Sequence, residues 1–355
     1  MRDEFAILHF DGSKMAMAVG TRVGANFSIK RQANLDYSGI LDGEFVEPAE
    51  MPGLLAQLTK KVTGQLRTTT LTIEVPAMFC RVFVDTITDT FERPRRVTKR
   101  DIDRVMKRPN EHLAEAAGMV PVHMDIMYWQ LDGARPQLNP DGATATELFA
   151  KRSVIFALES FVSIIRNALV GLPFTDVEFV PAPLSRALYL IDEESRDAGC
   201  RMLHCDMFST TVVSVAGDNL SAIHTVPLGM AHVANDLCVV LECDYPVARG
   251  LMGALMLNLT PSDGDELDIA GERFDTQLVG DIVRARLSEI AEGILDATGD
   301  GKMYICGGGI SAIRGGRDFL SRELNIPLVQ TFCPRTAMAD AEDPAIHAIL
   351  KRFRG

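Results

Sequence analysis

The sequence has fewer basic than acidic residues, and it lacks the patterns typical of nucleic-acid-binding, membrane-spanning and secreted proteins. Its 355 residues include 36 Lys and Arg against 48 Asp and Glu, a formal net charge of −12. This balance argues against general nucleic-acid binding, because phosphate neutralisation needs lysine and arginine. No run of about 18 uncharged apolar residues occurs, so we expect no membrane-spanning helix. The N-terminus, MRDEFAILHF, has acids where a secretory signal needs a basic region, which favours a cytoplasmic protein.

The seven cysteines include no C-x-x-C pair. Cys200/Cys205 and Cys238/Cys243 repeat a four-residue gap, but no histidines stand beside them at zinc spacing. The sequence therefore argues against a structural metal and favours reduced, mostly buried thiols.

Strand-like and helix-like segments alternate along the chain, which is typical of an α/β fold. The length and the 47% hydrophobic content are sufficient for two or more packed lobes. We expect one strand at Thr70–Val75 and another at 123–133, and a loop with short strands over 258–275. Apolar periodicity predicts helices over 48–66, 160–169, 184–191, 231–241 and 277–297.

Two β-hairpins about 195 residues apart follow a similar plan. The first joins Phe5–His9 to Met15–Val19 through Asp11-Gly12-Ser13-Lys14. The second joins Arg201–Cys205 to Val212–Ala216 through the hydroxyl-rich turn of HCDMFSTTVVSV. Turn N–H groups and hydroxyls can bind phosphate oxygens, and Asp206 could hold a hydrated Mg²⁺. Two such hairpins suggest a duplicated fold whose halves face each other across a cleft.

The stretch YICGGGISAIRGG, 304–316, places three glycines between a strand-like and a helix-like run. Gly307-x-Gly309-x-x-Ala312 formally fits a dinucleotide fingerprint, but no acid follows about twenty residues later to bind a ribose. A turn without a ligand is one alternative. The other is a loop whose backbone approaches a ligand, followed by a helix N-terminus with unpaired N–H groups.

The most basic stretch is ERPRRVTKRDIDRVMKR, 92–108. Thr98 and Asp101 form a carboxylate variant of the capping box and predict the start of a helix there. A solvated helix with one apolar face accounts for this pattern. The functional alternative is a docking face for an acidic partner or a neighbouring subunit.

In this order the motifs resemble the actin-like superfamily and, within it, the bacterial cell-division family FtsA. HFDGSKMAMAVG resembles the first phosphate hairpin, HCDMFSTTVVSV the second, and YICGGGISAIRGG the adenosine motif. RVTKRDIDRVM resembles the helix of the small inserted domain of FtsA-type actins, and VPLGMAHVANDL and IVRARLSEIAEGI resemble helices of the second lobe. The resemblance is collinear from about residue 5 to 330.

The resemblance implies an actin-like (RNase H-like) fold of two α/β lobes. The first lobe would comprise 1–75, 159–195 and 335–355, and the second 196–334, with an outer subdomain at about 245–285. A small α+β domain of FtsA type would be inserted at 76–158. ATP with Mg²⁺ would bind between the lobes, with Asp206 at the metal. The implied nucleotide contacts are Gly12, Ser13, Lys14, Asp206, Ser209, Thr210, Thr211, Gly229, Arg286, Gly307, Gly308 and Gly309.

Three departures from the family pattern weaken the phosphate chemistry. His9 matches the position of the first hairpin's Asp, and Met207-Phe208-Ser209 replaces a glycine run, with the bulky Phe208 where phosphate should approach. The segment 246–252, PVARGLM, lacks the family's Glu and Lys near the ribose and base. We therefore expect ATP binding to be weak, altered or lost, and we assign no catalytic residue.

The implied function is an FtsA-like scaffold that polymerises into filaments or docks division-ring partners at the inner face of the membrane. The acidic tail of the tubulin-like division protein would bind the outer part of the second lobe, where Arg249 and Arg273 are basic. Two alternatives stay open: an active actin-like ATPase, and the platform of type IV pilus assembly, the PilM family, which shares the architecture.

The C-terminal segment DPAIHAILKRFRG, 343–355, has apolar residues at helical spacing beside three basic residues. Either a packed last helix of the first lobe or a membrane-surface helix fits this pattern. We favour the packed helix, and membrane contact would then be indirect.

Overall fold

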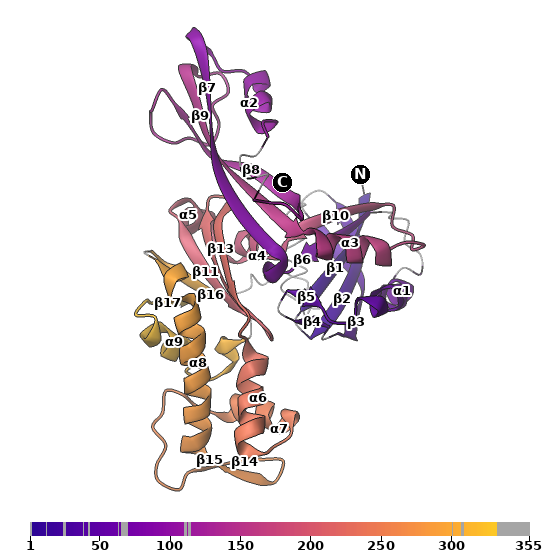
Figure 1. The fold of residues 1–355 in the computed structure, drawn as a ribbon, viewed down its shortest axis with the longest axis vertical. Coiled ribbons are helices and arrows are strands. Elements are labelled where there is room, and N and C mark those ends of the chain that lie inside the picture. Colours follow the sequence, from indigo (N-terminus) through magenta and orange to yellow (C-terminus); the bar gives the residue numbers. More distant parts are fainter. Residues whose placement is uncertain are drawn as a thin grey trace.

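The computed structural model describes residues 2–11, 13–23, 26–37, 39–41, 43–62, 64, 70–109, 112, 115–299, 301–306 and 309–331. Figure 1 shows an elongated molecule with a narrow sheet at one end, two sheet-containing lobes in the middle and a helical part at the other end. The expected C-terminal helix at 343–355 lies outside the described residues.

The first lobe contains a five-stranded sheet of order β10-β6-β1-β2-β3. The strands β1 (Arg2–Asp11), β2 (Lys14–Val23) and β3 (Asn26–Asp36) are antiparallel. The strands β6 (Thr70–Val75) and β10 (Asp176–Pro181) run parallel to β1. The remaining elements of this lobe are β4 (Ile40–Leu41), β5 (Glu44–Phe45), η1 (Pro48–Glu50), α1 (Met51–Val62), η2 (Ala77–Phe79), α3 (Glu159–Ala168), α4 (Ala182–Leu190) and α5 (Glu193–Asp197).

Strand β1 is buried on both faces, and alternate side chains enter different cores. Ala6, Leu8 and Phe10 belong to the main core, which includes the apolar sides of α1 and α3 and continues into the sheet of the second lobe. Phe5 and Ile7 pack in a smaller cluster on the other face. This alternation is the period of two that a strand imposes. It also places His9 on the same face as Phe5 and Ile7.

The second lobe repeats this topology with the sheet order β13-β12-β11-β16-β17. The strands β11 (Cys200–Cys205), β12 (Thr210–Ala216) and β13 (Asn219–Val226) are antiparallel. The strands β16 (Met303–Cys306) and β17 (Leu328–Gln330) are parallel to β11. The two sheets thus share one plan, which confirms the predicted duplication. Their antiparallel hairpins also distinguish them from the parallel sheet of a dinucleotide-binding domain.

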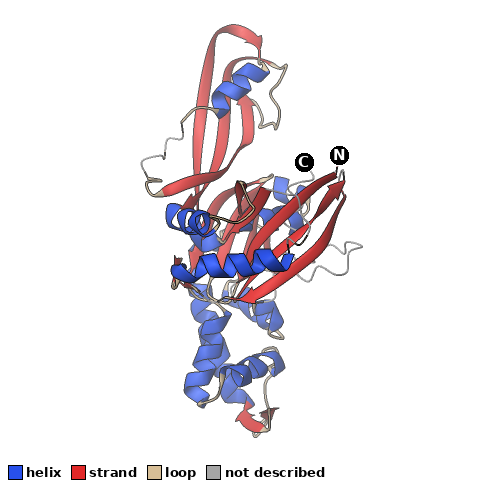
Figure 2. Ribbon diagram, turned by 90° about the vertical axis from the view of Figure 1, so that its right-hand side faces the viewer, coloured by secondary structure: helices blue, strands red, loops and turns tan. Residues whose placement is uncertain are grey.

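A three-stranded antiparallel sheet is inserted between β6 and β10 and forms the narrow end of the molecule (Figures 1 and 2). Its order is β7-β9-β8, with β7 (Cys80–Arg96), β8 (Met119–Leu131) and β9 (Thr144–Leu158). Helix α2 (Lys99–Met106) packs on its outer part. The backbone N–H and hydroxyl of Thr98 donate to Asp101 Oδ2 at 2.9 and 2.7 Å, which confirms the predicted cap.

The opposite end consists of α6 (Met230–Leu241), α7 (Tyr245–Ala254), α8 (Thr276–Thr298) and the hairpin β14 (Glu266–Ile269) with β15 (Glu272–Asp275). The apolar sides of these helices form one core with η3 (Ile310–Ala312) and α9 (Gly316–Glu323). In the part of the chain that the structure describes, no helix has the length and apolar character needed to cross a membrane.

Candidate nucleotide cleft between the lobes

Segments from five parts of the chain meet around one cavity of about 460 Å³. The turn after β1, the end of β11, the start of α6, helix α7 and the segment after β16 each contribute to its lining. This volume is typical of small-molecule sites in proteins. The lining residues are Ser13, Lys14, His204, Cys205, Asp206, Met207, Met230, Tyr245, Arg249, Met252, Gly253, Gly309, Ala312 and Ile313. The structure therefore brings together both predicted hairpins and the predicted glycine segment.

The turn after β11 places Asp206 at the cleft. The Asp206 backbone N–H donates to the carbonyl oxygen of Ser209 at 2.8 Å, and Asp206 Oδ1 accepts the N–H of Met207 at 2.7 Å. These bonds fix the turn through its own backbone. Asp206 lines both this cavity and a smaller adjoining pocket that contacts the first lobe.

Backbone N–H groups at the start of α6 form hydrogen bonds to this turn. The N–H groups of Met230 and Ala231 donate to the carbonyl oxygens of Asp206 and Met207 at 3.0 and 2.8 Å. A Cβ on Gly229 would lie 2.4 Å from the Asp206 carbonyl oxygen, so only glycine permits this approach. These two donors at the helix N-terminus hold the turn, and Gly229 itself positions Asp206.

The hydroxyls of the second hairpin have partners inside the protein. Thr210 Oγ1 donates to the Leu228 carbonyl oxygen at 2.7 Å, and Thr211 Oγ1 lies 3.0 Å from Thr225 Oγ1. Thr210 and Thr211 are buried, and neither lines the cavity. Ser209 lines the smaller pocket instead. Of this predicted phosphate-binding group, only Asp206 lies at the main cavity.

Phe208 does not line the cavity where phosphate was expected to approach. It lines the smaller pocket together with Phe10, Tyr37 and Ile40 of the first lobe. Lys14, Arg186 and Asp206 line the same pocket, so the obstruction of a phosphate by this ring remains a prediction.

The glycine segment lies against the end of β11. A Cβ on Gly309 would lie 2.1 Å from the Cys205 carbonyl oxygen, so a side chain there would separate the two segments. The expected helix directly after the glycines is wrong: the short 3-10 helix η3 follows, and α9 begins only at Gly316. Gly307 and Gly308, like Gly12 of the first hairpin, lie outside the described residues.

Arg286 lies away from the lining of this cavity. Its guanidinium pairs with Asp236 through contacts of 2.6 and 2.9 Å and so joins α8 to α6. In this structure Arg286 connects two helices of the second lobe, and its predicted contact with a nucleotide remains a prediction.

A buried polar chain beneath the cleft was not anticipated from the sequence. His9 Nδ1 on β1 contacts Glu74 Oε2 on β6, and each side chain is 1% exposed. Glu74 Oε1 lies 3.8 Å from Arg186 Nη2 on α4. Burial lowers the pKa of His204 well below its usual value, and the charge of Arg186 adds to this effect. Two features of the sequence could have indicated it: the single acid Glu74 within TLTIEV and the single arginine Arg186 within the mostly apolar α4.

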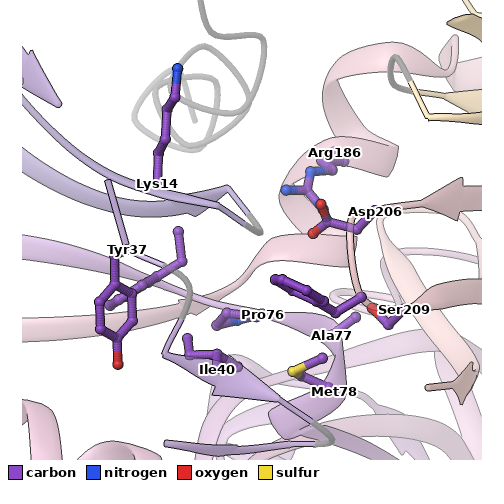
Figure 3. Close-up of a pocket in the computed structure, with 11 residues that line it drawn as sticks. Lys14, Tyr37, Ile40, Pro76, Ala77, Met78, Arg186, Asp206 and Ser209 are labelled. Carbon is purple, nitrogen blue, oxygen red and sulfur yellow. The ribbon is translucent and has the colours of Figure 1, made fainter. Parts of the chain in front are cut away.

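The described residues around Asp206 offer a divalent cation one carboxylate, and that carboxylate already faces a guanidinium (Figure 3). Mg²⁺ takes oxygen ligands, usually one or two carboxylates with phosphates and water. Asp206 is the only acidic residue among the described lining of the cavity and of the smaller pocket. Figure 3 shows the Arg186 guanidinium and the Asp206 carboxylate turned toward one another. Among the described residues, no three His, Cys, Asp or Glu side chains are arranged to hold a metal.

No protein-family profile and no curated protein matches this sequence. Solved structures do match. The PilM–PilN type IV pilus biogenesis complex aligns with a TM-score of 0.64 at 14% identity, over 99% of this chain and 98% of that one. MreB5 of Spiroplasma citri bound to ADP gives 0.53 at 9%, over 99% and 98%. The ethanolamine utilization protein EutJ from Carboxydothermus hydrogenoformans gives 0.51 at 11%, over 98% and 90%. These likenesses confirm the actin-like fold.

Proposed function

We propose that this chain is an actin-fold assembly platform that holds an adenine nucleotide in its cleft and docks partner proteins. The observation that carries the proposal is the end-to-end likeness to PilM of the PilM–PilN complex, which covers 99% of this chain and so includes the inserted sheet. The MreB5 structure with ADP supports a nucleotide as the occupant of the cleft. The cavity volume of about 460 Å³ and the basic Lys14 and Arg249 in its lining are compatible with that ligand.

Turnover of the nucleotide is not the role we assign to the cleft. Hydrolysis needs a base or a polar side chain that orients the attacking water, within hydrogen-bond reach of it. Asp206 is the only described carboxylate in the lining, and one of its oxygens accepts a backbone N–H. A nucleotide that binds one arrangement of the two lobes more tightly than another would stabilise that arrangement.

The inserted sheet supplies the docking surface in this proposal. Its tip, residues 92–108, carries eight basic and three acidic residues, a net charge of +5 in a chain of net charge −12. Arg93, Lys99 and Arg100 are exposed there. We call this surface the basic tip. Its charge favours an acidic partner segment, through attraction that steers association and weakens with salt.

Self-association is a related role that the charge distribution favours. The outer subdomain, 245–285, carries seven acidic and three basic residues, a net charge of −4. The basic tip and this subdomain lie at opposite ends of the molecule (Figure 1). Opposite charges at opposite ends are compatible with end-to-end assembly, in which the basic tip of each copy contacts the outer subdomain of the next.

A division scaffold of FtsA type is the second candidate, and the basic tip is the observation that favours it. An acidic tail of a tubulin-like protein would find little positive charge at the outer subdomain. Arg249 lines the cleft, and Arg273 pairs with Glu266 at 3.4 Å. We therefore place such a tail at the basic tip in this alternative.

Deletion of the gene in its source organism separates the two candidates. A pilus platform predicts loss of surface pili with normal septation, whereas a division scaffold predicts elongated cells with missing septa. Charge reversal at Arg100 of the basic tip, Arg100→Glu, should reproduce the deletion phenotype. A matched Arg317→Glu variant should not, since the exposed Arg317 lies on α9, outside both the basic tip and the outer subdomain. Normal pili and normal septation after deletion would contradict both candidates.

A further inference from the structure

The floor of the cleft contains a fixed positive charge where nucleotide-binding actin folds are expected to use a metal. Arg186 lies on α4, the helix that leads from the first lobe toward the second, and its side chain is 14% exposed. Together with Lys14 and Asp206 it lines the smaller pocket, and Lys14 and Asp206 also line the main cavity. The guanidinium therefore borders the region where the phosphates of a nucleotide would lie.

The buried Glu74, itself in contact with His9, lies beside Arg186. Glu74 Oε1 lies 3.8 Å from Arg186 Nη2, and Glu74 Oε2 contacts His9 Nδ1. A carboxylate that is 1% exposed is unfavourable without a positive charge nearby, and the Arg186 guanidinium supplies that charge. His9 occupies the place where the resembling family has an acid, and here it supports Glu74.

We propose that Arg186, anchored through Glu74 and His9, supplies to a polyphosphate the positive charge that Mg²⁺ would otherwise supply, so that the cleft binds nucleotide in a metal-free form. This inference rests on the proposed nucleotide-binding role of the cleft. Guanidinium groups match phosphate oxygens in charge and in planar geometry. Lys14, Arg186 and Arg249 are three cations against the single carboxylate of Asp206 in the combined lining.

A divalent cation at Asp206 would compete with this arrangement. A divalent ion repels a guanidinium twice as strongly as a monovalent ion would at the same distance. Figure 3 shows Arg186 directed at the same carboxylate that the ion would need. A metal would therefore have to displace Arg186, which would leave Glu74 buried without its cation.

The test is calorimetric titration of the full chain with ATP, once with EDTA and once with excess Mg²⁺. We expect affinity in EDTA to equal or exceed that in Mg²⁺. Arg186→Gln should weaken binding in EDTA at least tenfold, and Arg186→Lys should weaken it less. The control Arg284→Gln removes a positive charge on α8 and should leave the affinity unchanged.

Asp206→Asn keeps the test decisive if Arg186→Gln does not fold. Removal of the only described carboxylate of the lining should preserve or strengthen ATP binding in EDTA, whereas loss of a metal ligand would weaken binding in Mg²⁺. Binding only with Mg²⁺, or binding weakened by Asp206→Asn, would overturn the inference and leave the nucleotide-binding role intact. Absence of binding in both buffers would overturn the inference and that role together.

Discussion

The buried ion pair between Asp85 and Arg152 joins the inserted sheet to the basic tip. Both side chains have 0% exposure. Arg152 Nε and Nη2 donate to Asp85 at 2.9 and 2.5 Å, and Nη1 donates to the Arg108 carbonyl oxygen at 2.7 Å. Arg152 thus connects β9 to β7 and to the segment after α2. Loss of its counter-charge should loosen both contacts.

We predict that Asp85→Asn lowers the free energy of unfolding of the insertion by about 3–5 kcal/mol, because it leaves a buried guanidinium unpaired. The double variant Asp85→Leu/Arg152→Met should recover part of this loss, since an apolar pair needs no counter-charge. Recovery would be incomplete because the Arg108 carbonyl oxygen loses its donor, at about 1–3 kcal/mol. The control Asp89→Asn breaks pairs with the half-exposed Arg104 and with Arg108, and should cost about 1 kcal/mol or less.

Urea unfolding followed by tryptophan fluorescence measures this prediction within the insertion itself. Trp129 is the single tryptophan of the chain, and it is 3% exposed in the core of the inserted sheet. Its signal therefore reports on this subdomain without contributions from the two lobes. The reasoning would be refuted if Asp85→Asn shifted the midpoint no more than Asp89→Asn does, or if the double variant were less stable than Asp85→Asn.

Three further predictions concern the second lobe. Gly309→Ala should lower the melting temperature in calorimetry and abolish ATP binding, because its Cβ would lie 2.1 Å from the Cys205 carbonyl oxygen; an unchanged protein would contradict this close approach. Arg286→Ala should cost only about 1 kcal/mol in urea unfolding, since its partner Asp236 is 31% exposed; a loss several times larger would show that the pair is a major link between the two helices. The pKa of His204 in the folded protein lies below the ordinary 6.5. As the pH drops below about 6.5, His204 takes up a proton in the unfolded chain before it does so in the folded protein, so the free energy of unfolding should fall. His204→Asn should flatten that slope between about pH 7.5 and pH 5.5, and an unaltered slope would assign it to other groups.

Features set by local sequence were predictable. Both hairpins follow from apolar runs separated by short polar turns, and the cap of α2 follows from Thr98 and Asp101, three residues apart. The convergence on one cleft was also predicted, because the order of the motifs matched a known fold. Such features depend on neighbours in the chain or on collinear order, and a single sequence contains both.

Features set by distant contacts were not predictable. His9 and Glu74 are 65 residues apart in sequence, and Arg186 joins them from a third element. The directions of the Thr210 and Thr211 hydroxyls depended on which carbonyl and hydroxyl groups the neighbouring segments supplied. Phe208 likewise turned toward a pocket made by the other lobe. In each case the partner that decides the outcome lies more than ten residues away.

The central claim is that the cavity between the two hairpins and Gly309 is a nucleotide site. A crystal structure of the full chain grown with saturating AMPPNP tests it most directly. We predict density for one nucleotide, with its phosphates beside Lys14 and Arg186 and its base near Gly309 and α7. Saturating nucleotide with density elsewhere, or with none in this cavity, would contradict the account.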